Sequence, residues 1–443
     1  MKRMSLVLAG LLLPALLQAQ LPDPSTRAMG MGGAYTSLAR GYEAVAWNPA
    51  MLAAVGRPGF TIDLPHVNFE FGSNTYGLSD VRKYANTYLS DADKATLLGK
   101  IDTTLTLRAL IGAAPFGLSI GPFAVLVGTA GQMNVGVGKD AVRLALYGNA
   151  PRAGASSLFT AQGSNGRAWA ASTIAGSFAL PIQLPVGHLS VGATYKYVIG
   201  HLLGSANDLG TQVTFTPLFS ATEAGEAVYT NYGKCDKFSP FNTGSCGGRA
   251  GTGYGVDLGG TLQLAGRAIT LSAVLVNALG KMTWDASRLC YDRTLRQTTQ
   301  SPSGNVQDTV LLQQSLCNQA IATNPQAAAL RDSLLANADF ARLARFGFAL
   351  RSGMLTVAAD AQIRLKAGLD QQSTKLLSAG AEYRLLGIIP LRVGASSDFA
   401  GATMVSAGTG LQLLGINLDA SIASISGTTR PGVRVGLGVG LIW

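Results

Sequence analysis

The chain has 443 residues, of which only 13% are charged, and its formal net charge is +10. Charged residues make up about a quarter of an ordinary soluble protein, so this composition argues against water as the only solvent. The basic residues form no run, no helical stripe and no series interleaved with aromatic residues, which argues against nucleic-acid binding.

An export signal occupies the start of the chain. Residues 6–17, LVLAGLLLPALL, are the longest apolar run and follow Lys2 and Arg3. This is the layout of a cleaved signal, so we assign residues 1–20 to a signal peptide, whose removal leaves a net charge of +8. The run is too short for a transmembrane helix, which needs roughly 20 apolar residues, and no other run approaches that length.

The next stretch, residues 21–58, joins small residues to a Trp-Asn-Pro-Ala motif. We expect it to form a plug. Asn48 can cap the free N–H groups of a helix start, and Pro49 fits the first helical position. A helical turn should follow over residues 51–55 and end at Gly56. The residues that define the expected plug motif are Gly30, Gly32, Gly33, Trp47, Asn48, Pro49 and Ala50.

These residues resemble the N-terminal hatch of FadL-type outer-membrane proteins. That family comprises 14-stranded barrels that carry long-chain fatty acids and other hydrophobic compounds, and its hatch contains an Asn-Pro-Ala motif, matched here by residues 48–50. A similar hatch occurs in FadL-like barrels of unknown function and in a barrel subunit of type IX secretion. The resemblance therefore implies an architecture, with a plug at 21–58 and a barrel at 59–443, rather than a cargo.

Apolar and polar residues alternate with a period of two through the rest of the chain. This pattern is typical of strands with one face toward lipid and the other toward a lumen. It is clearest over residues 433–443 and recurs over 189–199, 254–264 and 355–365. The final residue, Trp443, resembles the terminal aromatic residue that outer-membrane barrels present to their assembly machinery.

Short and long connections alternate between these strands. Six short connections lie near residues 116–121, 184–187, 264–267, 351–354, 386–390 and 413–416. Seven longer ones lie at 73–103, 137–167, 201–251, 284–342, 367–374, 397–402 and 426–431. Thirteen connections predict an all-β, 14-stranded antiparallel transmembrane β-barrel, with tight periplasmic turns and longer outer loops. A further hairpin at Val213–Phe219 would make sixteen strands instead.

Two of the outer loops carry predicted structure of their own. Residues 80–101 have helical spacing, with Ser90 and Asp93 able to cap a helix, and residues 327–335 form a second expected helix. We expect disulfides within loops, although four cysteines permit three connectivities and their spacing fits no zinc site. The expected pairs are Cys235 with Cys246 and Cys290 with Cys317.

Charged residues on the inward face of the strands give the expected lumen a basic balance. They either pair with one another and with the plug, or some of them draw the carboxylate of an amphiphile inward, since arginine grips it at two points. The basic candidates are Arg108, Lys196, Arg364, Lys366, Arg384, Arg392 and Arg434. The acidic residues with the same orientation are Asp257, Asp360, Glu382 and Asp419.

The alternation slips within the first strand, at Pro65 and His66. Apolar residues occupy the even-numbered positions from 60 to 64 but the odd-numbered positions from 67 to 71. Proline donates no hydrogen bond to a sheet, so a break is expected there. It is either an ordinary bulge or a gap through which a hydrophobic molecule leaves sideways into the bilayer.

Together these features predict an outer-membrane channel for passive uptake of hydrophobic or amphiphilic small molecules, such as long-chain fatty acids. The alternative is a non-transporting barrel that anchors or adapts other proteins in secretion or surface assembly; an outer-membrane lipid hydrolase is a remoter third. The expected partners are membrane lipid, a hydrophobic cargo and the assembly machinery, with the chain acting as a monomer. No catalytic residue, metal or cofactor is expected.

Overall fold

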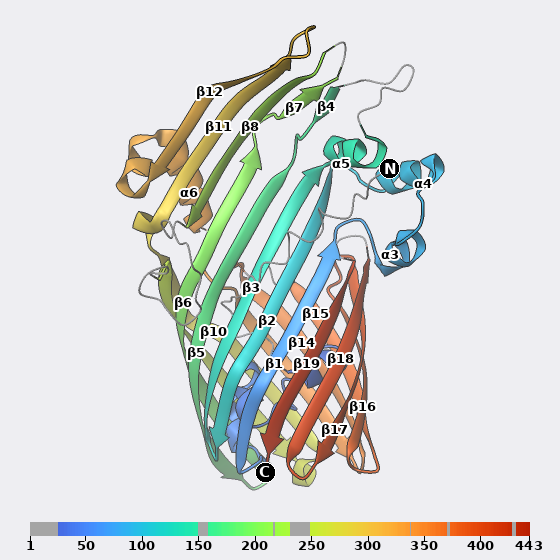
Figure 1. The fold of residues 1–443 in the computed structure, drawn as a ribbon. Coiled ribbons are helices and arrows are strands. Elements are labelled where there is room, and N and C mark those ends of the chain that lie inside the picture. The colour runs from blue at the N-terminus through green and yellow to red at the C-terminus, as the bar shows by residue number, and fades with distance from the viewer. Residues whose placement is uncertain are drawn as a thin grey trace.

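The computed structural model describes residues 25–148, 158–215, 218–230, 249–336, 338–369, 373–427 and 431–443. A closed ring of fourteen antiparallel strands dominates it (Figure 1). In ring order the strands are β1 (Phe60–Ser73), β2 (Thr104–Ile120), β3 (Phe123–Gly138), β5 (Asn165–Leu184), β6 (Gly187–Asp208), β9 (Gly251–Leu264), β10 (Ile269–Trp284), β13 (Arg342–Ser352), β14 (Leu355–Lys366), β15 (Lys375–Leu385), β16 (Ile389–Ser397), β17 (Ala402–Leu413), β18 (Ile416–Gly427) and β19 (Gly432–Ile442). Pairing of β1 with β19 closes the ring.

The prediction of fourteen strands is confirmed, and the sixteen-stranded alternative is wrong. Strand β6 has 22 residues, far more than the roughly 9–11 that cross a bilayer. Residues 188–200 of β6 pair with β9, whereas residues 204–208 pair with β8 (Ser220–Thr230). The hairpin near Val213–Phe219 therefore joins an extension of the sheet beyond the ring. The extension also contains β4 (Leu158–Thr160), β7 (Gln212–Thr214), β11 (Leu289–Gln300) and β12 (Val306–Cys317).

The strands alternate between an apolar outer face and a polar inner face, as the sequence pattern predicts. In β14, Leu355 and Val357 point outward and are 42% and 39% exposed, whereas Thr356 and Asp360 are buried inside. Apolar side chains on the outside of a closed sheet suit contact with lipid, because the ring leaves no backbone edge unpaired.

The two ends of the barrel differ. All six tight turns lie at the end that holds the C-terminus, and Phe60 N donates to Trp443 O (3.1 Å) at this turn end. The opposite, outer end carries the sheet extension and α3 (Leu78–Tyr84), α4 (Asp91–Gly99) and α5 (Lys139–Tyr147), with α6 (Pro325–Ala336) beside the extension (Figure 1). Short 3₁₀ helices lie at η4 (Ala265–Arg267), η5 (Ala286–Arg288) and η6 (Asn318–Thr323).

The stretch 80–101, predicted to be helical, contains α4 and most of α3, whereas α5 was not predicted. Ser90 caps α4, since its Oγ accepts from Asp93 N (3.2 Å) and the Asp93 carboxylate accepts from Ser90 N (3.2 Å). Helix α6 covers the predicted helix at 327–335. None of the helices in the described segments combines the length and apolar character needed to cross a membrane.

Residues 25–58 lie inside the barrel near the turn end and form the plug (Figure 1). They contain α1 (Thr26–Gly30), η2 (Gly41–Glu43), α2 (Ala44–Trp47) and η3 (Pro49–Ala53). Apolar plug residues such as Leu38 and Leu52 pack with alanines of the inner wall in one buried cluster. The predicted signal peptide at 1–20 and plug residues 21–24 lie outside the described residues.

Candidate functional site

The small residues of the plug lie directly against glycines of the barrel wall. A Cβ on Gly394 of β16 would lie 2.2 Å from Gly32 N, and one on Gly380 of β15 would lie 2.3 Å from Met31 O. Gly32 has a φ of +70°, which residues with a side chain rarely adopt. Gly30 packs in the same way, since a Cβ there would lie 3.2 Å from a backbone carbon of β17. Backbone therefore meets backbone, which explains the run of small residues.

The Asn-Pro-Ala motif fixes another face of the plug to β9. Asn48 Oδ1 accepts from Ala50 N (3.1 Å) and caps η3, in which Pro49 is the first residue. Its Nδ2 donates to Thr36 O (3.1 Å) within the plug and to Thr261 Oγ1 (2.8 Å) in the wall. The motif thus caps a helix, braces the plug and attaches it to the barrel.

A buried charge network holds the start of the plug. Arg27 donates to both carboxylate oxygens of Glu382, at 2.6 and 2.9 Å. Arg392 donates to the same carboxylate (2.8 Å) and also to Asp419. Arg384 adds a longer contact of 3.3 Å to Glu382. Because buried charges are costly unless paired, this network strongly favours one position of the plug in the barrel.

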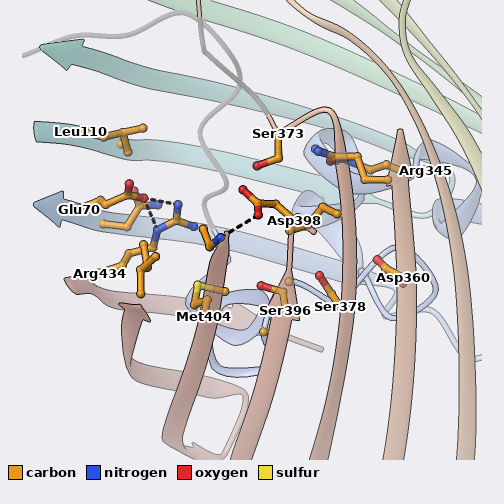
Figure 2. Close-up of a pocket in the computed structure, with 18 of the residues that line it drawn as sticks. Glu70, Leu110, Arg345, Asp360, Ser373, Ser378, Ser396, Asp398, Met404 and Arg434 are labelled. Carbon is orange, nitrogen blue, oxygen red and sulfur yellow. Dashed lines mark hydrogen bonds and ion pairs between the residues drawn. The ribbon is translucent and has the colours of Figure 1, made fainter. Parts of the chain in front are cut away.

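Plug and wall enclose a cavity of about 260 Å³ on the outer side of the plug. Its lining combines apolar and charged side chains, several of which Figure 2 shows pointing into the space. The larger apolar contributors are Trp47, Leu110, Trp169, Val276 and Met404. The cavity can therefore contact a hydrocarbon part and a charged part of the same molecule.

Glu70 and Arg434 form one charged pole of this cavity (Figure 2). Arg434 donates through Nε (2.9 Å) and Nη2 to Glu70 Oε2, and Arg108 Nη2 lies 3.4 Å from Glu70 Oε1. One carboxylate thus faces two guanidinium groups, and this pole carries net positive charge.

A second pole lies across the cavity, where Arg345 covers the plug motif. Its guanidinium lies 4.9 Å from the centre of the Trp47 ring, within cation–π range, and its Nε donates to Gln362 Oε1 (2.9 Å). Asp360, which lies below Arg345 in Figure 2, accepts from the backbone N–H groups of Tyr35 (2.9 Å) and Thr36 (2.8 Å). These contacts join the cavity wall to the plug, so a structural change in the wall can be transmitted to the plug.

A second cavity of about 330 Å³ lies toward the outer rim of β1, β2, β3 and β5. It shares Glu70 and Arg108 with the first cavity and is lined by side-chain amides such as Asn134 and Asn165. The pole at Glu70 therefore lies between an outer and an inner compartment.

The regular pairing of β1 is interrupted at Pro65 and His66, where the strand has a bulge. These two residues of β1 lie opposite a single residue of β19, Gly438. On the other side of β1, the residues between Asp63 and His66 form no pair with β2. A matching shift in β2 places Pro115 at the same level. Both strands therefore carry a proline, which donates no hydrogen bond, where they should pair.

The charged groups around the cavity are placed to bind a ligand. In the parts of the chain that the structure describes, no group of three or more His, Cys, Asp or Glu side chains is placed to hold a metal ion. Arginine and carboxylate groups at the edges of a partly apolar space can hold and orient a charged amphiphile.

Comparison with known families gives one match. The model of a family of unknown function, DUF5723, matches residues 49–301, which is more than half of the chain. The chain belongs to this family. No curated protein matches the sequence.

Several solved structures are similar to this DUF5723 protein. A FadL homologue from Pseudomonas aeruginosa is 11% identical with a TM-score of 0.47, covering 96% of this chain and 99% of its own. The toluene transporter TbuX from Ralstonia pickettii is 12% identical, with a TM-score of 0.45 and coverages of 94% and 97%. The toluene transporter TodX from Pseudomonas putida is 12% identical, with a TM-score of 0.44 and coverages of 93% and 96%.

The predicted lumen charges of this DUF5723 protein divide into four groups. Arg108 and Arg434 meet at Glu70, as described above. Lys196 pairs with Asp257 (2.6 Å) in the inner wall. Arg384 and Arg392 join the network at the base of the plug. Arg364 and Lys366 lie at the outer end of β14 instead, where they bond Thr374 (3.0 Å) and Asp339 (2.6 Å).

Three important cavity residues of the DUF5723 protein were missing from the sequence prediction: Glu70, Arg345 and Asp398. For Glu70 and Arg345 the signal was present. Glu70 alternates with the outward Phe69 and Phe71, and Arg345 precedes the outward Phe346. Asp398 lies just beyond β16, where its carboxylate accepts from Ala400 N and Ala402 N, and strand parity does not apply.

One predicted disulfide is present in the extension. Cys290 and Cys317 are bonded and lie opposite each other in the β11–β12 hairpin. The predicted partners Cys235 and Cys246 lie outside the described residues.

Proposed function

We propose that this chain is an outer-membrane channel for the passive uptake of small amphiphilic molecules. The observation that carries the proposal is the cavity of about 260 Å³ between plug and wall, which joins apolar Trp47 and Leu110 to charged Glu70 and Arg434. Ligand pockets generally measure about 300–1,000 Å³, so the cavity suits a small cargo. The closed ring with an apolar outer face supports a place in a membrane.

The two cavities suggest a route. An amphiphile would enter the outer compartment, pass the pole at Glu70 and Arg108, and place its hydrocarbon part against Trp47. From there it would leave past the plug, or sideways where Pro65 interrupts the pairing of β1 and β2. The route contains no catalytic step, and bond-making groups play no part in it.

Uptake into proteoliposomes tests the proposal. Radiolabelled hexyl sulfate is a suitable probe because its permanent charge makes it cross pure lipid slowly. We expect the protein to admit hexyl sulfate faster than sucrose. Ala46→Trp should block most of this uptake, because Ala46 lines the cavity beside Trp47 and the larger ring would fill it.

Ala379→Trp is the matched control, because Ala379 is exposed on the outer face of β15. Its uptake should equal that of the unmodified protein. Equal uptake by protein-containing and empty vesicles would contradict a channel and would favour a barrel that anchors other proteins. Loss of uptake in both tryptophan variants would contradict the assigned cavity.

A further inference from the structure

A third, shallow pocket of about 20 Å³ opens where β10 and β13 separate near the outer end of the wall. The pairing of these two strands ends at Val276 and Leu343, whereas β10 continues to Trp284. The side chains around the pocket are mainly basic and aromatic. They include Tyr254, Lys281, Asp339, Phe340, Arg342 and Lys366. One cavity therefore brings three cations and a single carboxylate together.

Lys281 lies on the outside of the barrel. It is exposed, and the next residue, Met282, is buried inside. Lys281 also lies directly opposite Tyr254 of β9, which is exposed as well. Residues directly opposite each other in antiparallel strands share a face of the sheet. The ammonium group of Lys281 therefore belongs to the surface that faces away from the lumen.

Arg342 and Lys366 lie on the same outer face. Arg342 precedes Leu343, which is buried inside. The alternation of β14 alone would turn Lys366 inward, but the register with β13 shifts at Leu365, so Lys366 lies opposite Arg342. Like charges directly opposite each other destabilise a sheet unless an anion lies near them.

The positive charge of this pocket exceeds the negative charge. Lys366 Nζ lies 2.6 Å from Asp339 Oδ2. Arg342 donates through Nε to Asn277 O (3.0 Å), a neutral acceptor. Lys281 makes no hydrogen bond or ion pair with the residues that the structure describes. One carboxylate thus serves three cations, which leaves an excess of positive charge on the outer surface.

The pocket lies at the edge of the apolar outer face of the barrel. On β10, β13 and β14, outward apolar residues lie just to the turn side of the three cations. These residues are Leu279, Phe346 and Leu365, which are 63%, 52% and 55% exposed. Apolar side chains therefore give way to cations at the same level on three adjacent strands. In a membrane, this is the level at which the hydrocarbon of the lipid ends and the headgroups begin.

Tyrosines continue this level onto the neighbouring strands. Tyr254 of β9 lies opposite Lys281, and Tyr197 of β6 lies opposite Tyr254. Arg249 Nη1 donates to the Tyr197 hydroxyl (2.9 Å) and adds a fourth cation. Tyrosine is enriched where a membrane meets water, because its ring is apolar and its hydroxyl is polar. The row of tyrosines and cations therefore marks a membrane interface rather than an arbitrary part of the surface.

We propose that Lys281, Arg342 and Lys366 form a binding site for the phosphate headgroup of an anionic lipid, in the leaflet at the outer end of the barrel. Guanidinium and ammonium groups both bind phosphate oxygens. A space of about 20 Å³ holds about one water-sized atom, so it suits one headgroup oxygen. The acyl chains would lie along Leu279 and Phe346. This inference rests on the membrane location of the proposed channel and not on transport.

Native mass spectrometry of the purified full-length protein in detergent tests the site. The protein is titrated with phosphatidylglycerol or with phosphatidylcholine of the same acyl chains, so that only the headgroup differs. We expect phosphatidylglycerol to bind more tightly. Lys281→Gln should weaken its binding about fivefold, which is the contribution of one basic residue beside an anionic lipid. Binding of phosphatidylcholine should stay the same.

Lys83→Gln is the matched control, because it removes the same charge from an exposed residue of α3 that does not line the pocket. It should bind phosphatidylglycerol like the unmodified protein. Lys281→Arg keeps the charge and should retain the affinity. Equal binding of the two lipids by the unmodified protein would overturn the site. An equal loss in Lys281→Gln and Lys83→Gln would also overturn it, because net charge alone would then explain the binding.

Inorganic phosphate at the concentration of the lipid separates a lipid site from a site for the free anion. We expect phosphatidylglycerol to stay bound, because contact of its acyl chains with the apolar outer face adds to the affinity. Displacement of the lipid would assign the pocket to a free anion and contradict the proposal. Because lipid binding is measured without uptake, failure of this site would leave the test of the channel unaffected.

Discussion

Asn48 of the plug donates a hydrogen bond of 2.8 Å to Thr261 Oγ1 of the barrel wall, although 213 residues separate them in the chain. The same amide side chain also caps η3 through its oxygen. A single residue therefore decides both the local turn of the plug and its attachment to β9. This double role explains why the motif needs an amide, which donates and accepts at once.

Replacing Asn48 tests this attachment. Asn48→Ala should destabilise the protein by about 2–3 kcal/mol, because it removes a helix cap and leaves buried partners unpaired. Asn48→Asp keeps the cap acceptor and should cost less than the alanine. Denaturant unfolding in detergent measures both, and a double-mutant cycle with Thr261→Val should give a coupling of about 1 kcal/mol. A coupling of zero would mean that the hydrogen bond contributes nothing to the attachment.

Two adjacent glycines of β9 provide a matched pair for the seat of the plug. A Cβ on Gly259 would lie 2.4 Å from Asn48 Oδ1, whereas a Cβ on Gly260 meets nothing within 4 Å. Gly259→Ala should therefore cost about 1–3 kcal/mol by overpacking and make the plug more accessible to protease. Gly260→Ala should be tolerated. Equal protease sensitivity of the two variants would contradict the close contact.

The wall of this barrel could be predicted because lipid imposes a period of two on every strand. The outward Phe69 and Phe71 in β1, and the slip at Pro65 that places them there, both follow from residue order alone. The number of strands followed from the alternation of short and long connections. The sheet extension was missed, because the part of β6 that continues beyond the ring pairs with β8.

The interior of the plug was less predictable. Arg27 and Glu382 pair across 355 residues. The alternation of β15 turns Glu382 inward, but it does not reveal Arg27 as its partner. Arg40 has the same character, since its environment arises only when the plug enters the ring. The alternation along each strand predicts which wall side chains point into the lumen. It does not predict their partners, because it does not give the position of each side chain along the barrel axis.

The pole at Glu70 should control the charge preference of the lumen. Glu70→Gln leaves Arg434 and Arg108 without their carboxylate, so the local potential becomes more positive. An additional uncompensated charge changes the energy of a nearby ion by about 1 kcal/mol even in water, which is roughly fivefold in anion occupancy. Reversal potentials in planar bilayers should shift toward anion selectivity. Glu223→Gln in the outer extension is the control, and an identical shift there would exclude a local effect.

The disulfide between Cys290 and Cys317 should stabilise the outer hairpin without supporting the barrel. It closes a loop with a sequence separation of 27, for which chain entropy gives a stabilisation of about 3.5 kcal/mol. In Cys290→Ser/Cys317→Ser, protease should cut near the tip between β11 and β12, while heat-dependent migration of the barrel on a gel stays the same. Loss of that migration would show that the hairpin is needed for the ring.

The ion pair between Asp80 in α3 and Lys100 after α4 should hold the outer helices together over a wide pH range. The hydrogen bond from Lys100 is the main cause of a pKa of Asp80 below its usual value. A carboxylate with a lowered pKa stabilises the folded form above the ordinary carboxyl pKa, and this contribution disappears as the pH falls through the lowered value. Hydrogen-exchange protection of α3 should therefore persist in mild acid and decline only at lower pH. Asp80→Asn should remove this dependence, whereas Asp102→Asn, at an exposed residue with no hydrogen bond in the described segments, should keep it. Protection of α3 that falls with pH equally in Asp80→Asn would assign the dependence to another group.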